Sequence, residues 1–147
     1  MKHDLDEVYR DLEKANITVL PYRFRHLKSV SLADEKVVGI DHSKIDGYAE
    51  EYTILIHEKG HFDSGAFYTM SSPYPLKEQA ERRADRAAIL QYIPLEELRD
   101  CLAGGIVEIW DLAEHFGVTE EFMRKSIGYY RDILGISLEP ERIFFKK

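Results

Sequence analysis

Apolar residues recur along the chain with two different periods, which predict where helices and strands form. Leu5, Val8, Tyr9 and Leu12 follow helical spacing, so an amphipathic helix is expected over residues 3–15. Short apolar runs predict three strands, at residues 17–20, 30–32 and 37–40. The last two runs are separated by only a few polar residues, so they are expected to form a hairpin.

The rest of the chain is predicted to be helical. The apolar run Ile54-Leu55-Ile56 indicates that a helix over residues 47–62 is buried. A loop rich in Ser, Pro and aromatic residues follows, and Pro75 then begins a helix that reaches about Tyr92. Glycines separate three further predicted helices, at about residues 95–103, 106–116 and 119–134.

This order of elements predicts an α+β fold, with an N-terminal helix and a small antiparallel sheet followed by helices. A chain of 147 residues has the usual size of one domain. We therefore expect a core over residues 1–94 and a helical C-terminal subdomain over residues 95–147, both within one compact unit.

Composition excludes several classes of protein. The net charge of −7 disfavours broad binding to nucleic acids or anionic membranes, both of which attract clustered Lys and Arg. No apolar run approaches the roughly 18 residues of a membrane span, and the charged start of the chain does not resemble a signal peptide. Cys101 is the only cysteine and cannot form an internal disulfide. A cytoplasmic protein is therefore expected.

The sequence His57-Glu58-Lys59-Gly60-His61 contains a His-Glu-x-x-His motif inside a predicted helix. Residues four apart lie on one helical face about a turn apart, so His57 and His61 can share one tetrahedral zinc ion. Glu58 follows the first histidine and can reach an attacking water as a base without ligating the metal. A glycine between the two histidines is expected where another segment approaches the helix closely.

A catalytic zinc site needs a third protein ligand. Glu78, Glu81 and Asp85 share one face of the next predicted helix, so spacing alone does not choose between them. Glu81 ranks first, because Ala84 and Ala88 continue its stripe and would let the two helices pack closely. Alternatively, all three carboxylates are solvated surface charges.

These residues resemble the ImmA/IrrE family of zinc metallopeptidases. The matching segments are His57-Glu58-Lys59-Gly60-His61-Phe62 and Glu81-Arg82-Arg83-Ala84-Asp85-Arg86-Ala87-Ala88, closing on Tyr92-Ile93-Pro94. Ala87 departs from the family pattern, which commonly has an aromatic residue there. The resemblance covers about residues 50–94, and the helical C-terminal third is similar to short phage and mobile-element members.

The resemblance implies a minimal zincin-like core that binds Zn²⁺ through His57, His61 and Glu81, with Glu58 as the catalytic base. It also implies a cytoplasmic endopeptidase that cleaves a helix-turn-helix transcriptional repressor and so derepresses the genes which that repressor silences. No spacing in this sequence indicates the substrate by itself.

Other residues have weaker claims to a catalytic role. Tyr68 and Tyr74 lie in the loop between the motifs and are candidates to stabilise an oxyanion or to line the cleft. His115 is a candidate transition-state donor, although a packing or capping role at a helix end is favoured. The strand at residues 37–40 is a candidate for substrate binding by strand addition.

Two alternative functions remain open at this point. The helix, Gly117 and second helix after Thr119 resemble a helix-turn-helix, but Glu120 and Glu121 would face the DNA backbone, which disfavours DNA binding. The other alternative is a non-catalytic zinc-binding regulator that sequesters a repressor. Retention of Glu58 argues against it, because such a site has no need for a base.

Overall fold

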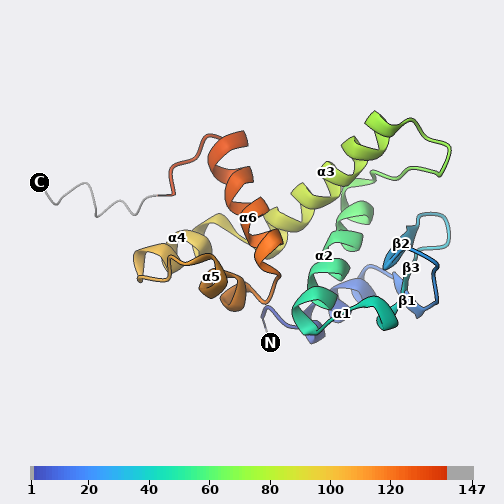
Figure 1. The fold of residues 1–147 in the computed structure, drawn as a ribbon, viewed down its shortest axis with the longest axis horizontal. Coiled ribbons are helices and arrows are strands. Elements are labelled where there is room, and N and C mark those ends of the chain that lie inside the picture. The colour runs from blue at the N-terminus through green and yellow to red at the C-terminus, as the bar shows by residue number, and fades with distance from the viewer. Residues whose placement is uncertain (1, 139–147) are drawn as a thin grey trace, which may run out of the picture.

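The computed structural model describes residues 2–138 and has an α+β fold, as the sequence predicts. In Figure 1 the strands lie at one end of the molecule and α4–α6 at the other, with α2 and α3 between them. The elements are α1 (Leu5–Lys14), β1 (Thr18–Pro21), β2 (Ser29–Leu32), β3 (Val37–Ile40), the 3₁₀ helix η1 (His42–Lys44), α2 (Tyr48–Ser64), α3 (Tyr74–Tyr92), α4 (Leu95–Ala103), α5 (Ile109–Phe116), α6 (Glu120–Gly128) and the π-helical turn η2 (Tyr129–Ile133). No helix within residues 2–138 is long and apolar enough to cross a membrane.

The sheet is mixed, so the prediction of an antiparallel sheet is wrong in one pairing. The strand order is β1-β3-β2, with β2 antiparallel to β3 as the hairpin pattern predicts. β1 pairs with β3 in parallel, with Thr18 opposite Val37. After β1 the chain passes to the opposite edge of the sheet and forms β2 there, antiparallel to β1. The hairpin then places β3 between them, where it runs in the same direction as β1.

The helices α2 and α3 pack so closely that their backbones touch. A Cβ atom added to Gly60 would lie 2.1 Å from the carbonyl oxygen of Ala84, so no larger residue fits there without displacing α3. Ala80, Ala84 and Ala88 are buried along the facing side of α3. This confirms the prediction that another segment approaches the helix closely at Gly60. The close contact fixes α3 against α2.

Hydrogen-bonded tyrosines join α1 to the two central helices. Tyr52 of α2 donates to Glu7 at 2.6 Å, and Tyr92 of α3 donates to Asp11 at 2.6 Å. Asp4 caps the helix by accepting a hydrogen bond from the backbone N–H of Glu7. Because Glu7 and Asp11 meet these tyrosines, α1 is held by paired polar groups as well as by apolar packing.

The C-terminal helices pack against the end of α3 and differ in detail from prediction. The segment 106–108 precedes α5 and is not helical, and the predicted helix over residues 119–134 is divided into α6 and η2. The wider π turn shifts the register of the apolar face, so Met123 is fully buried whereas Leu134 is 45% exposed. Tyr130 donates a hydrogen bond to the carbonyl of Ile93 at 2.7 Å, which anchors η2 at the end of α3.

Candidate metal centre

A cleft of about 520 Å³ lies between the sheet and the paired helices α2 and α3. It is lined by residues 27–31, which include most of β2, and by residues 67–70 of the loop between α2 and α3. His57, Glu58 and His61 of α2 and Glu81 of α3 line the same cleft. The structure therefore brings all four predicted site residues into one hollow.

His57, His61 and Glu81 offer ligand atoms that lie within 4.8 Å of one another. Nε2 of His57 is 2.8 Å from Oε1 of Glu81, and Nε2 of His61 is 3.2 Å from its Oε2. The two imidazole rings are perpendicular, with centroids 4.9 Å apart. Two imidazole nitrogens and one carboxylate are a donor set that suits zinc and leaves a position open.

The opposite nitrogen of each ring is also fixed. Nδ1 of His57 is 2.8 Å from Oδ1 of Asp85, and Nδ1 of His61 is 2.6 Å from the carbonyl oxygen of Ala66. Outer partners of this kind set the tautomer and orientation of histidines that bind metals. Sequence spacing left Asp85 as a possible third ligand. The structure instead places it against Nδ1 of His57, on the side of the ring that faces away from Glu81.

Each ring is bracketed by hydrogen-bond acceptors on both sides. The carbonyl of Ala66 only accepts, so Nδ1 of His61 carries a hydrogen, and a neutral ring then turns the lone pair of Nε2 toward the carboxylate of Glu81. His57 lies between the carboxylates of Glu81 and Asp85. Two acceptors facing each other repel unless a cation lies between them, either a second proton on the ring or a metal ion.

The pKa shifts have the sign expected of such a cluster. Burial lowers the pKa of His57, but hydrogen bonds to Asp85 and Glu81 outweigh it and raise that pKa to about 10. Burial raises the pKa of Glu81, but hydrogen bonds from His57, His61 and Tyr68 hold it well below its usual range. The cluster therefore favours positive charge between its acceptors, which a divalent cation would also supply.

Glu58 of α2 is buried and lines the cleft next to β2. Ser29 donates to its Oε2 and Ser31 donates to its Oε1, each at 2.5 Å. The two serines are two residues apart on β2, so their side chains lie on one face of the strand. They hold the carboxylate beside the histidines without adding another charge.

Of the two tyrosine candidates, only Tyr68 reaches the cluster. Its hydroxyl donates to Oε2 of Glu81 at 2.6 Å. Tyr74 instead donates to Glu78, and both of these residues are exposed. His115 lies 2.8 Å from Glu97 in the C-terminal helices, so it belongs to a different cluster.

Sequence reasoning did not identify the supporting residues around the site. Ser29 and Ser31 carry a usable signal, since polar residues at alternate positions of a short strand share one face. Lys125 of α6 contacts Oδ2 of Asp85 at 3.0 Å, and nothing in its local sequence indicates this. The carbonyl of Ala66 is a backbone group, so no residue type could reveal its role.

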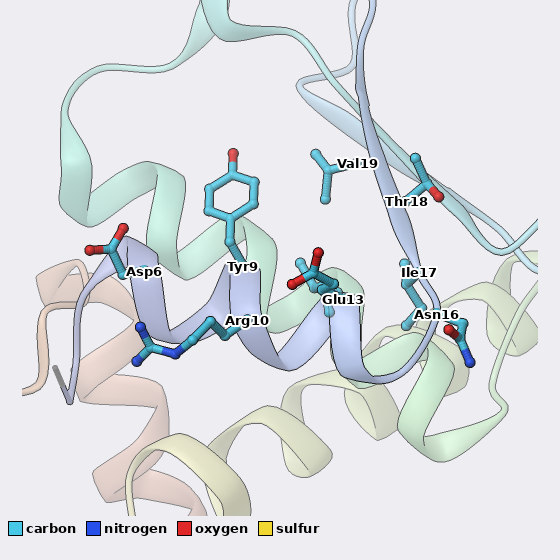
Figure 2. A pocket seen from close by; sticks show the side chains of 9 residues that line it. Asp6, Tyr9, Arg10, Glu13, Asn16, Ile17, Thr18 and Val19 are labelled. Carbon is cyan, nitrogen blue, oxygen red and sulfur yellow. The ribbon is translucent and has the colours of Figure 1, made fainter.

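A second hollow, of about 640 Å³, lies between α1 and β1. In Figure 2, Tyr9 projects from α1 on the same side as Val19 of β1. Asp6, Arg10 and Glu13 lie along the helix. The residues that line it include no histidine or cysteine. This hollow therefore lacks the imidazole and thiolate donors that transition metals prefer, whereas the cleft beside β2 has two imidazoles.

Comparison with known proteins found no family model, no curated protein and no solved structure that matches this chain.

Proposed function

We propose that this chain is a zinc-dependent endopeptidase, with zinc held by His57, His61 and Glu81. The observation that carries the proposal is the bracketing of both imidazoles by acceptors, which leaves a site for a cation between the rings and Glu81. The donor set, the anchored Nδ1 atoms and the open cleft all fit zinc.

Glu58 would act as the general base. When bound, zinc supplies Lewis-acid activation of the scissile carbonyl and of the attacking water. Glu58 would take a proton from that water and pass it to the leaving amine. Its two hydrogen bonds, from Ser29 and Ser31, orient the carboxylate for this role, and one of them must weaken while Glu58 holds the proton.

The substrate would bind as an extended segment of protein beside β2. Among the described residues β2 pairs with β3 alone, and residues 27–31 line the same cleft as the histidines, which supports binding of the substrate at the outer edge of β2. The sequence hypothesis placed strand addition at residues 37–40, but β3 is the central strand and has both edges paired. Strand addition is therefore assigned to β2.

The resemblance to ImmA/IrrE metallopeptidases supports a more specific version of the proposal. In that version the substrate is a helix-turn-helix repressor, cleavage occurs in the cytoplasm, and α1 to α3 with the sheet form a minimal zincin-like core. The repressor substrate, the cytoplasmic location and the zincin-like core are supported only by the short stretch of matching residues. The proposed peptidase chemistry is supported by the geometry of the cleft.

The test is cleavage of protein substrates by the zinc-loaded chain and by Glu58→Gln. Denatured casein and a purified phage-type helix-turn-helix repressor serve as substrates, and mass spectrometry identifies new termini. We expect cleavage by the wild-type chain and a loss of at least about 100-fold in Glu58→Gln, with zinc content unchanged. A wild-type chain that binds zinc and cleaves neither substrate would favour the non-catalytic regulator.

The DNA-binding alternative has less support. The helices α5 and α6 meet at Gly117, as in a helix-turn-helix, but the first turn of α6 carries Glu120 and Glu121, both exposed. Negative side chains at this position repel phosphates.

A further inference from the structure

A second cluster of metal-ligating side chains lies far from the cleft, where the start of the chain meets α4 and α5. Nε2 of His3 is 2.6 Å from Oε2 of Glu97, and Nε2 of His115 is 2.8 Å from the same oxygen. The ligand atoms of these three residues lie within 4.8 Å of one another. The donor set is again two imidazoles and one carboxylate.

We propose that His3, Glu97 and His115 form a second site for a divalent transition metal, with Zn²⁺ as the expected ion. Imidazole and carboxylate donors suit zinc, and three protein ligands leave a position for water. This site is independent of the proposed peptidase function, because it shares no residue with the cleft.

The imidazoles of His3 and His115 are held in place by the surrounding packing. A Cβ atom at Gly117 would lie 2.4 Å from the carbonyl oxygen of His3, so the first residues are pressed against the end of α5. The backbone of His3 has a φ of 63°, and its N–H donates to Glu7 at 2.9 Å. The rings of His3 and His115 both contact the ring of Phe116. Packing therefore fixes both imidazoles.

The two oxygens of Glu97 have different partners, and acidic residues lie near His3. Lys2 pairs with Oε1 of Glu97, so Oε2 is the oxygen that both imidazoles share and that a metal would use. A cavity of about 730 Å³ is lined by His3 and by three acidic residues, Asp4, Asp6 and Glu114. The negative charge of these residues attracts cations to the neighbourhood of His3.

The second site is expected to bind zinc more weakly than the first. Nδ1 of His3 is buried and has no hydrogen-bond partner within residues 2–138, whereas both histidines in the cleft have an acceptor behind them. Loss of such an outer partner lowers metal affinity about 10–100-fold. A metal here would join three segments that are distant in sequence, so it would stabilise the contact between the N-terminal residues and the C-terminal helices.

The test counts zinc by equilibrium dialysis of the full chain at saturating zinc. We expect about two zinc ions in the wild-type chain, one in His57→Ala, one in Glu97→Gln and none in the double variant. A Glu96→Gln variant is the matched control, because Glu96 is exposed on the same helix and should leave the count at two. His115→Gln provides a second variant at the cluster, since the His115 side chain is 36% exposed and tolerates change.

A second measurement does not depend on the cleft. In the His57→Ala background, zinc should raise the thermal midpoint of unfolding, and Glu97→Gln should abolish that rise. A count that Glu97→Gln and His115→Gln both leave unchanged would overturn the second site. A single zinc that His57→Ala retains and Glu97→Gln loses would support the second site and contradict the proposed peptidase centre.

Discussion

Asp85 contacts Nδ1 of His57 at 2.8 Å, on the side of the ring opposite to Glu81. Lys125 of α6 contacts the other oxygen of Asp85 at 3.0 Å. The carboxylate therefore connects the C-terminal helices to the candidate metal centre through a single side chain. In the proposed metal site Asp85 would orient the ligand His57, so it would be a positioning residue.

Replacing Asp85 with Ala should weaken zinc binding in the cleft by about 10–100-fold, because His57 loses the acceptor that fixes its tautomer. Competition with a chelator measures the affinity. Glu78→Ala is the control, since Glu78 is exposed on the same helix and bonds only to Tyr74 among the described residues. Equal affinities in the two variants would mean that Asp85 does not support the metal.

Tyr68→Phe should lower peptide cleavage by about 100-fold, because it removes a hydroxyl that could stabilise the oxyanion of the reaction. The zinc content should stay unchanged. Burial, followed by the hydrogen bond to Glu81, raises the pKa of Tyr68 to about 12, so its hydroxyl stays protonated at neutral pH and can donate. Tyr74→Phe is the matched control, because Tyr74 lies in the same region of the chain but contacts Glu78. Similar turnover in both variants would remove Tyr68 from the mechanism.

Gly60→Ala should lower the free energy of unfolding by about 1–3 kcal/mol, because the new Cβ atom would collide with the carbonyl of Ala84. It should also weaken zinc binding, since the histidines and Glu81 lie on the two helices that would be forced apart. Urea unfolding measures the change.

The control for Gly60 is Gly128→Ala in α6. A Cβ atom at Gly128 would lie 3.9 Å from its nearest neighbour, an ordinary contact distance. That variant should be more stable than wild type by about 0.5–1 kcal/mol. A stable Gly60→Ala chain with normal zinc affinity would show that the close approach of α2 and α3 is not required.

The sequence predicted most of the fold because its helices carry strong local signals. The helix over 75–92 has Pro near its start and Pro94 beyond its end, and α3 follows these limits within one residue. The parallel pairing of β1 with β3 could not be predicted, since it depends on which side of the sheet the chain crosses. The π turn at residues 129–133 also has no simple pattern in the sequence.

The candidate site was predicted where chemistry is local and missed where it is not. The spacing of His57 and His61 is fixed by one helix, so their proximity follows directly from the sequence. Spacing alone could not choose between Glu81 and Asp85. The packing of α2 on α3 places Glu81 against Nε2 of both histidines, and only the structure shows that Asp85 meets the other nitrogen of His57. Long-range contacts such as Lys125 with Asp85 need the tertiary fold.

Asp41 should make stability depend on pH on the acid side. Hydrogen bonds from Lys44 and Ser43, and from the backbone of Phe24, hold the pKa of this carboxyl well below its usual range. Its contribution is therefore present above the unfolded pKa of about 3.9 and is lost as the pH falls toward the folded value.

An Asp41→Asn chain should be less stable than wild type at pH 7, and the difference should shrink as the pH falls from about 5 to 2. Thermal unfolding across this range measures it. Asp34→Asn is the control, because Asp34 is exposed in the hairpin turn. A difference that stays constant with pH would show that Asp41 is not the titrating group.

The most direct test of the metal centre is the zinc content of His57→Ala and Glu81→Ala relative to the wild-type chain, with Glu78→Ala as the control on α3. Each of the first two variants should lose one zinc ion per chain, and Glu78→Ala should lose none. If His57→Ala and Glu81→Ala both hold as much zinc as the wild-type chain, these residues do not bind a metal and the proposed peptidase function is wrong.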